Sequence, residues 1–318
     1  MKKICVLGLG YIGLPTASIL GNKGYQVIGV DVKKEAVDTI NRGGIHIVEP
    51  DLEILTRSAV HSGNLKASLK PEAADAFIIC VPTPLVDEGQ GGNKVPELKY
   101  VEQATESIVP FLKKGNLVIL ESTSPAGTTH DVVAPILAKS GLKVGEDIYL
   151  AYCPERVLPG HILKEAVEND RIIGGFNAKS AEVAEVLYRS FVTGNIFRTN
   201  DTTAELCKLA ENSFRDVNIA FANELALIAE KHGVNPWELI KLASKHPRVK
   251  ILNPGPGVGG HCIAVDPWFI VHKDPEITPL IRTARQVNDS MPEVVVKKVK
   301  ASAKKFKKPV IACLGLAY

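Results

Sequence analysis

The sequence predicts an α/β protein: an N-terminal, doubly wound parallel sheet, then an all-helical central region with one long helix that links the two. Two observations predict the sheet. Apolar runs of strand length alternate with segments of helical length, and a glycine-rich turn follows the first apolar run. The third observation predicts the long helix, because residues 203–232 contain no proline and their apolar side chains recur at helical spacing.

The glycine-rich turn is the first element with a chemical meaning. Gly8, Gly10 and Gly13 form a G-x-G-x-x-G pattern, and the next expected strand, Gln26–Val30, ends in Asp31. Such glycines allow the tight turn, the approach of a pyrophosphate and close helix packing, while the acid accepts hydrogen bonds from the adenosine ribose. The pattern predicts a Rossmann-like domain that binds NAD rather than NADP, because a carboxylate repels the 2′-phosphate.

The rest of the sheet domain, residues 1–199, follows in order. Strands are expected at Lys3–Leu7, Ala76–Val81, Leu117–Leu120, Ile148–Tyr152, Arg171–Gly174 and Asn195–Arg198, helices at Lys34–Arg42, Asp51–His61 and Leu98–Leu112, and an exposed polar excursion at Val86–Val95. Ligands bind at the carboxyl ends of parallel strands. Thr83 and Thr123 follow two such ends, so they either contact the nicotinamide side of NAD or cap helices.

A carboxylate and a guanidinium stand side by side after the strand at 148–152. Glu155 and Arg156 are either functional groups at a strand end or a surface ion pair. The sequence leaves both interpretations open.

The helical region, residues 200–306, begins with the long helix of about 30 residues, roughly 45 Å at the standard rise. That length exceeds what one small core needs, so we expect the helix to span domains and to support a homodimer. Lys208, Asn212 and Arg215 lie on one of its faces, as a functional row or as an exposed polar stripe. Shorter helices are expected at Pro236–Ser244, Pro267–Val271 and residues 277–305.

A glycine-rich loop between these helices carries one thiol. Residues 255–267 place Cys262 beside His261 and four residues before Asp266. A thiol among backbone N–H groups and cationic neighbours tends to ionise, and the thiolate is a nucleophile. The alternative is a cysteine that acts as a small buried hydrophobe in a plain turn.

Composition excludes several classes of protein. The net charge of +3 is too small to indicate nucleic acid, and no aromatic residues interleave the lysines at 297–308 as a single-strand binder would need. Glycines and Pro15 interrupt the apolar run at residues 4–21, which argues against a membrane span. No two of the six cysteines form a C-x-x-C motif, so we expect neither a metal site nor disulfides, and a cytoplasmic location.

Six motifs together resemble those of the UDP-glucose/GDP-mannose dehydrogenase family. They are GLGYIGLP at 8–15, VPTP at 81–84, ESTSPAGTT at 121–129, YCPERVLPG at 152–160, KLAENSFRDVNIAFANE at 208–224 and GPGVGGHCIAVDPWF at 255–269. In combination, HPRV, GVGGHCIAVDPWFIV and NRGGIHIVEPDL are most similar to the UDP-N-acetyl-D-mannosamine 6-dehydrogenase branch. The resemblance covers nearly the whole chain.

The resemblance implies three domains. The first two are the NAD domain at 1–199 and the central, dimerising domain at 200–306 that carries the cysteine loop. Residues 307–318 are then expected to be the first strand of a C-terminal UDP-sugar-binding domain, which is otherwise missing from the chain. A chain truncated in this way is expected to be poorly active.

The implied reaction is the oxidation of the C6 alcohol of a UDP-N-acetylhexosamine, here UDP-N-acetyl-D-mannosamine, to the carboxylate, for surface polysaccharide precursors. It needs two NAD molecules, and Cys262 holds the half-oxidised sugar as a thiohemiacetal and then a thioester. Lys208 and Asn212 stabilise the oxyanion, Lys208 also serves in proton transfer, and Asp266 or Glu155, the latter through Thr123 and an ordered water, activates the hydrolytic water.

The resemblance also assigns contact residues. NAD contacts are implied at Gly8, Gly10, Tyr11, Ile12, Gly13, Asp31, Thr83 and Thr123, and substrate contacts at Arg156, Val157, Lys208, Asn212, Arg215, His246, Arg248 and Gly259.

Other functions stay open at this point. A UDP-N-acetylglucosamine or UDP-glucose 6-dehydrogenase differs only in the sugar. A two-electron hydroxyacid dehydrogenase of the 6-phosphogluconate type also pairs a nucleotide-binding domain with a long helix, but it has no need of Cys262. A non-enzymatic NAD-binding protein would bind NAD without turnover, and a zinc site at His261 and Cys262 lacks partner ligands at metal spacing.

Overall fold

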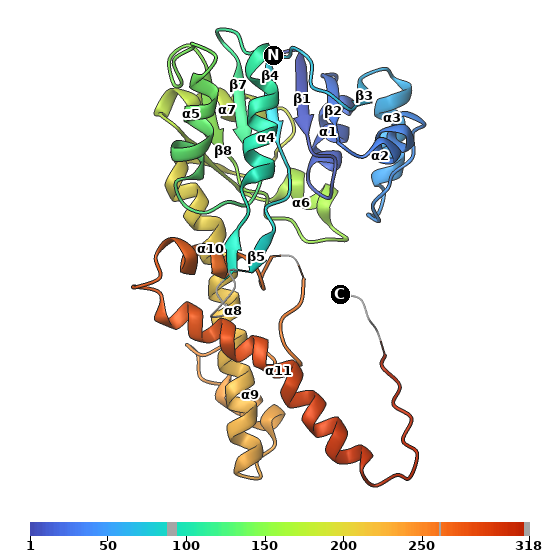
Figure 1. Cartoon of the computed structure of the whole chain (residues 1–318), viewed down its shortest axis with the longest axis vertical. Helices are drawn as coiled ribbons and strands as arrows, with labels where there is room; N and C mark the ends of the chain where they lie inside the picture. Colours follow the sequence, from blue (N-terminus) through green and yellow to red (C-terminus); the bar gives the residue numbers. More distant parts are fainter. Residues whose placement is uncertain (88–93, 261, 315–318) are drawn as a thin grey trace. The chain divides into compact units, whose positions relative to one another are not determined.

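The computed structural model describes residues 1–87, 94–260 and 262–314 (Figure 1). The chain divides into two compact units, residues 1–86 with 96–208 and residues 87–95 with 209–318. His261 and the last four residues of the expected final strand lie outside the described residues.

An eight-stranded sheet forms the first unit, in the order β10-β9-β8-β7-β4-β1-β2-β3. Its strands are β1 (Lys3–Leu7), β2 (Gln26–Val30), β3 (Leu65–Ser68), β4 (Ala76–Ile79), β7 (Leu117–Leu120), β8 (Tyr149–Tyr152), β9 (Arg171–Gly175) and β10 (Ile196–Asn200). The predicted doubly wound sheet is confirmed, with one antiparallel pairing, of β8 with β9, that the sequence did not predict. The chain leaves β1 toward β2 but returns to its other side as β4, so the ends of β1 and β4 open a crevice for a ligand.

Helices cover both faces of the sheet because each central strand buries both of its faces. Ile4 and Val6 of β1 belong to one apolar cluster, and Cys5 and Leu7 belong to the other. The first cluster includes side chains of α1 (Gly13–Asn22), α2 (Lys34–Asn41), α3 (Leu52–His61), α6 (Ile162–Glu168) and α7 (Ala178–Tyr188). The second includes side chains of α4 (Lys99–Ile108) and α5 (Ala134–Ala138), which is preceded by the π-helical turn η2 (Thr129–Val133).

Three local features differ from the prediction. Strand β3 was not expected, because it has only four residues and two of them, Lys66 and Ser68, are polar. The excursion at 86–95 is bounded by two short paired strands, β5 (Leu85–Asp87) and β6 (Lys94–Pro96). Helix α4 ends at Ile108 and continues only as the 3₁₀ turn η1 (Val109–Phe111), because Pro110 cannot donate a helical hydrogen bond.

Helices build the second unit, and the long helix begins in the last residues of the first unit. The predicted long helix is α8 (Asp201–Lys231), and it is followed by α9 (Pro236–Ala243), α10 (Asp266–Lys273) and α11 (Pro279–Ala303). Helix α8 begins two residues earlier than expected, because Asn200 Oδ1 accepts the N–H of Thr203 at 2.7 Å and caps the first turn. Within the described residues, no helix is both long enough and apolar enough to cross a membrane.

The strand expected near the end of the chain is absent where it is described. Residues 309–314 have no regular secondary structure. A strand needs a neighbour that completes its hydrogen bonds, and residues 309–314 belong to neither of the two described sheets.

Candidate functional site

The glycine turn after β1 has the geometry that a dinucleotide needs. Gly8 has a φ of +88°, and a Cβ added to it would lie 2.6 Å from the carbonyl oxygen of Cys80 at the end of β4. A Cβ on Gly13 would lie 1.8 Å from the Gly8 oxygen, so helix and turn touch there without space for a side chain. A Cβ on Gly10 would meet nothing within 4 Å, which leaves that backbone open to a phosphate.

Asp31 is held in place at the end of β2. Its Oδ2 accepts the N–H of Leu9, in the glycine turn, at 3.0 Å, and its Oδ1 accepts the N–H of Lys33 at 2.9 Å. The carboxylate is therefore fixed beside the turn. Nearby, Tyr11 is exposed and Ile12 is half-buried at the start of α1.

The structure joins the two threonines that the sequence placed at strand ends. Thr83 Oγ1 donates a hydrogen bond to the carbonyl oxygen of Thr123 at 2.6 Å. Thr83 therefore ties its own loop to the loop after β7, and it does so with its hydroxyl rather than by capping a helix.

Glu155 forms a buried ion pair, but with a residue that the sequence did not indicate. Its Oε2 lies 2.8 Å from Arg171 Nη2, and the two side chains are only 8% and 4% exposed. Its Oε1 accepts the backbone N–H of Arg156 at 2.8 Å, while the Arg156 guanidinium donates to the Asp170 carbonyl oxygen. The expected alternative of a surface ion pair between Glu155 and Arg156 is therefore wrong, because Arg171 of β9 takes the carboxylate.

Burial separates three cysteines of the first unit, Cys5, Cys80 and Cys153, from Cys262. Desolvation, followed in size by the charge of Glu121, raises the pKa of Cys80 well above its ordinary value, and Cys80 Sγ donates to Glu121 Oε2 at 3.2 Å. Desolvation raises the pKa of Cys153 to about 11 and that of Cys5 to about 12. These thiols are protonated at neutral pH and act as hydrophobes, whereas Cys262 is exposed.

Two predicted catalytic residues of the second unit are in direct contact. Asn212 Nδ2 of α8 donates to Asp266 Oδ2 at 2.5 Å, and Asp266 is 2% exposed at the first position of α10. The backbone N–H of Asp266 donates to the Cys262 carbonyl oxygen at 2.8 Å. The structure thus brings Cys262, Asp266 and Asn212 together, and Lys208, 8% exposed, precedes Asn212 by one helical turn.

The remaining predicted substrate residues lie on surfaces. Arg215, His246 and Arg248 are exposed, and His246 Nδ1 accepts the Arg248 N–H at 3.4 Å. Val157 is half-buried in the first unit. Gly259 lies in the cysteine loop, where an added Cβ would meet nothing within 4 Å.

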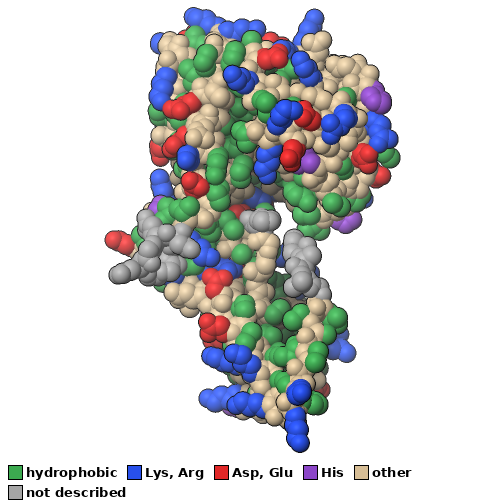
Figure 2. Space-filling view, turned by 45° about the vertical axis from the view of Figure 1, so that its right-hand side comes forward, with side chains coloured by type: hydrophobic (Ala, Val, Ile, Leu, Met, Phe, Trp, Pro, Cys, Tyr) green, Lys and Arg blue, Asp and Glu red, His purple; other side chains and the backbone are tan. Residues whose placement is uncertain are grey.

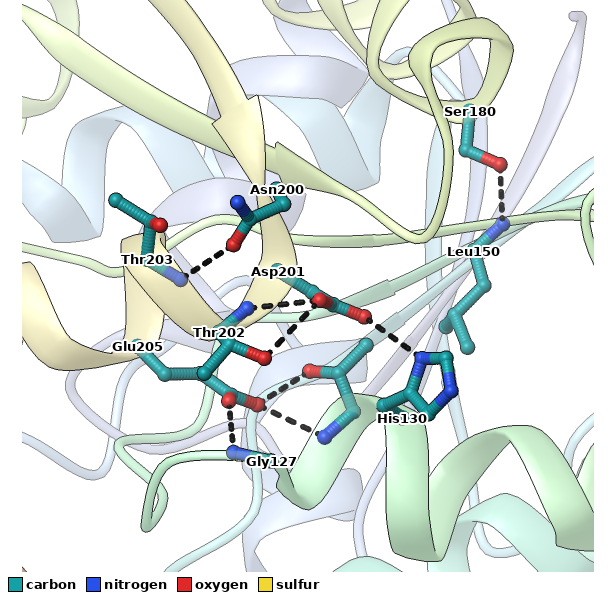
Figure 3. A network of polar contacts seen from close by, with 10 residues as sticks. Gly127, His130, Leu150, Ser180, Asn200, Asp201, Thr202, Thr203 and Glu205 are labelled. Atoms are coloured by element: carbon teal, nitrogen blue, oxygen red, sulfur yellow. Dashed lines mark hydrogen bonds and ion pairs between the residues drawn. The ribbon is translucent and has the colours of Figure 1, made fainter.

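Glu205, which the sequence pattern did not single out, holds the loop that carries Thr123. This carboxylate on α8 is fully buried, and it accepts the N–H of Gly127 at 2.6 Å and both the N–H and the hydroxyl of Thr129 at 2.8 and 2.6 Å (Figure 3). Beside it, His130 Nδ1 lies 3.8 Å from Asp201 Oδ2. The sequence offered one signal for Glu205: a charged residue among the apolar positions of the long helix.

Glu49 was missed as well. It is 5% exposed, and its two carboxylate oxygens accept the N–H groups of Gly160 and Ile162, each at 2.8 Å. It therefore binds the first turn of α6 and fixes the loop that carries Arg156 and Val157. In the part of the chain that the structure describes, no three His, Cys, Asp or Glu side chains are grouped to hold a metal ion.

Comparison with protein families gives two matches. Residues 2–192 match the NAD binding domain of the UDP-glucose/GDP-mannose dehydrogenase family, and residues 202–290 match its central domain. The first match covers the glycine turn, Asp31, Thr83 and Thr123, and the second covers the cysteine loop.

Individual relatives agree with these matches. The chain is 58% identical to an NDP-N-acetyl-D-galactosaminuronic acid dehydrogenase of Ralstonia nicotianae and 57% identical to a UDP-N-acetyl-D-mannosamine dehydrogenase of Campylobacter jejuni, with all of the chain and 75% and 79% of the relatives covered. The solved UDP-N-acetyl-mannosamine dehydrogenase of Staphylococcus aureus is 46% identical, with a TM-score of 0.91 over 100% of this chain and 74% of that one.

Proposed function

Because the chain belongs to the UDP-glucose/GDP-mannose dehydrogenase family and is an NAD-dependent dehydrogenase, we propose that it oxidises C6 of UDP-N-acetyl-D-mannosamine from alcohol to carboxylate. The relative from Campylobacter jejuni supports this sugar. The observation that carries the proposal is the exposed thiol of Cys262 at the start of a backbone turn that leads to Asp266, whose carboxylate Asn212 contacts, since an accessible thiol suits a covalent route.

The glycine turn and Asp31 would hold NAD, and two NAD molecules bound in turn would supply the hydride acceptors for the two oxidations at C6, while Lys208 takes the proton of the C6 hydroxyl in the first. After the first, the Cys262 thiolate adds to the aldehyde carbon and gives a thiohemiacetal, so the aldehyde does not diffuse away. Lys208 and Asn212 stabilise the oxyanion on that carbon. Loss of the second hydride leaves a thioester on the sulfur.

Water then cleaves the thioester, which releases the uronate and returns the thiol. We assign the activation of this water to Asp266, because its backbone N–H donates to the Cys262 carbonyl oxygen and Asp266 therefore lies in the turn that follows the cysteine. Glu155 then acts in this proposal by fixing the loop that carries Arg156 and Val157. Arg156, Arg215, His246 and Arg248 supply hydrogen-bond donors for the sugar nucleotide.

A galactosamine derivative is the second candidate substrate. It is favoured by the 58% identity to the Ralstonia enzyme, whose name specifies N-acetyl-D-galactosaminuronic acid. The two sugars differ in the orientation of hydroxyl and acetamido groups. Measuring NADH formation on UDP-N-acetylmannosamine, UDP-N-acetylgalactosamine, UDP-N-acetylglucosamine and UDP-glucose decides between them.

We also propose a homodimer in the reducing cytoplasm. Phe214, Phe221 and Ile228 lie seven residues apart along α8 and are all exposed, so they form an apolar stripe. Hydrophobic side chains on the surface of this unit are green in Figure 2. Such a stripe suits a second copy of the same helix.

The stoichiometry of NADH tests the reaction. We expect two NADH for each UDP-N-acetylmannosamine, and Cys262→Ala should lower uronate formation roughly 10³-fold or more, because no sulfur captures the aldehyde. Cys313→Ala is the matched control, since Cys313 is also exposed and outside the loop. One NADH per sugar with a released aldehyde or ketone would refute the thioester route, and NAD binding without any turnover would favour a non-enzymatic protein.

A further inference from the structure

One face of α8 carries more polar side chains than the proposed reaction uses. Asp216 follows Asn212 by one turn, and Asn223 follows Asn212 by eleven residues, which is close to three full turns at about 3.6 residues per turn. Asp216 and Asn223 are both fully buried. Buried polar groups are costly unless they are hydrogen-bonded, so their partners show what this face holds.

Asn223 holds the start of the cysteine loop. Its Oδ1 accepts the backbone N–H of Gly255 at 2.8 Å, and its Nδ2 donates to Asn288 Oδ1 of α11 at 2.8 Å. Gly255 is the first residue of the glycine-rich stretch that leads to Cys262. The side chain amide therefore connects the loop to two helices at once.

Asn288 is fixed in turn. It is 1% exposed, and its Nδ2 donates to the carbonyl oxygen of Asp216 at 3.0 Å and to Asp216 Oδ1 at 2.8 Å. Arg285 Nη1 donates to the same carboxylate oxygen at 2.5 Å. The loop also lies against Asn288 directly, because a Cβ added to Gly257 would lie 3.3 Å from the Asn288 carbonyl oxygen.

The other end of the loop is held by the same helix. Asn212 donates to Asp266, and the Asp266 N–H donates to the Cys262 carbonyl oxygen. Helix α8 thus holds the loop before Gly257 through Asn223 and after Cys262 through Asn212. Two anchors on one rigid element fix the path of the backbone between them better than either anchor alone.

We propose that Asn223 and Asn288 are positioning residues for Cys262: they anchor the first half of its loop between α8 and α11, so that the sulfur captures the aldehyde before it escapes. The catalytic part of this inference rests on the proposed function. Neither residue contacts substrate or NAD in it, and both act through the backbone of residues 255–257.

The experiment replaces Asn223 with Ala and compares it with Asn218→Ala. Asn218 lies on the same helix, but its Nδ2 donates only to the Phe214 carbonyl oxygen of that helix among the contacts described. Hydrogen–deuterium exchange of peptides covering residues 250–262 reports the anchor, and the NADH and aldehyde released per UDP-N-acetylmannosamine report its catalytic effect.

For Asn223→Ala we expect at least tenfold faster exchange in the loop, unchanged exchange in the sheet of the first unit, and an NADH yield that falls from two toward one as aldehyde appears. The KM for NAD should stay within twofold of the wild type. Asn218→Ala should match the wild type in every readout. Gly257→Ala adds a methyl group to the loop where it lies against Asn288, and it should give the same loss of NADH yield. If Asn223→Ala does not fold, Gly257→Ala tests the role of the anchored loop in its place.

Unchanged hydrogen–deuterium exchange in the loop of Asn223→Ala would refute the proposal that Asn223 anchors the loop. Faster exchange with a full yield of two NADH would overturn the role in catalysis. A wild-type yield of one NADH would instead refute the proposed function, and the exchange data would still test the anchor.

Discussion

At the scale of single residues, the environment decides what a side chain can do. Cys80 and Cys153 are thiols, as Cys262 is, but burial raises the pKa of both, and neither is a nucleophile at neutral pH. Glu205 shows the same effect for a carboxylate. Burial raises its pKa to about 7, although hydrogen bonds from Thr129 and Gly127 favour the charged form.

The raised pKa of Glu205 makes a prediction about stability. Between pH 4.5 and pH 7 the folded protein retains a proton that the unfolded chain has lost, so folding stability falls as the pH rises through this window. The loss amounts to at most about 3 kcal/mol. Urea unfolding at pH 5, 6, 7 and 8 should show it in the wild type and not in Glu205→Gln.

The difference between the two proteins isolates Glu205 from the other titrating groups. The glutamine side chain of the variant carries no charge at any pH, so every remaining pH effect is common to both curves. Parallel curves between pH 5 and pH 7 would show that Glu205 titrates at its ordinary value and that its three donors outweigh burial.

At the scale of elements, buried carboxylates connect segments that lie far apart in the sequence. Glu49 precedes α3, yet it binds the N–H groups at the start of α6, where a negative charge is favoured by the helix dipole. The loop that carries Arg156 and Val157 ends at this point. Its position is therefore set by a residue of another element.

We expect Glu49→Gln to raise the KM for the sugar nucleotide about fivefold and to change kcat less. The amide keeps only one acceptor oxygen, so one of the two N–H groups loses its partner, which costs about 1–3 kcal/mol. The loop that we propose to contact the substrate should then become less ordered. Initial-rate kinetics with varied UDP-sugar at saturating NAD measure the effect.

Glu53→Gln on α3 is the control. Glu53 is exposed and pairs only with Arg57 one turn away among the ion pairs described, and such surface pairs contribute little. If both variants raised KM equally, the effect would come from net charge and not from the contact of Glu49 with α6.

At the scale of the whole molecule, the apolar stripe on α8 predicts self-association. Phe221→Asp should convert the dimer to a monomer, because it places a charge in the centre of an apolar contact. Phe197→Asp is matched to it, since Phe197 of β10 is also 56% exposed and lies outside the stripe. Light scattering after size-exclusion chromatography measures both masses. A wild-type monomer, or a monomer produced equally by both variants, would contradict the interface.

The sequence by itself determined the order of most strands and helices, the use of NAD and the family. The first two conclusions depend on signals that are local in the chain: the alternation of apolar runs, the glycine spacing before α1, Asp31 at the end of β2, and the helical spacing of α8. The family depends on the resemblance of six motifs spread along the chain. It also singled out Cys262, Asp266 and Asn212, which the structure brings together.

Only the tertiary structure decided which buried polar groups hold the site. Glu155 pairs with Arg171 rather than with its neighbour Arg156, Glu49 binds the start of α6, and Asn223 binds Gly255. The physical reason is that a buried polar atom takes whichever partner the packed elements bring near it. That partner is set by packing across many residues of sequence, and no periodicity along the chain records it.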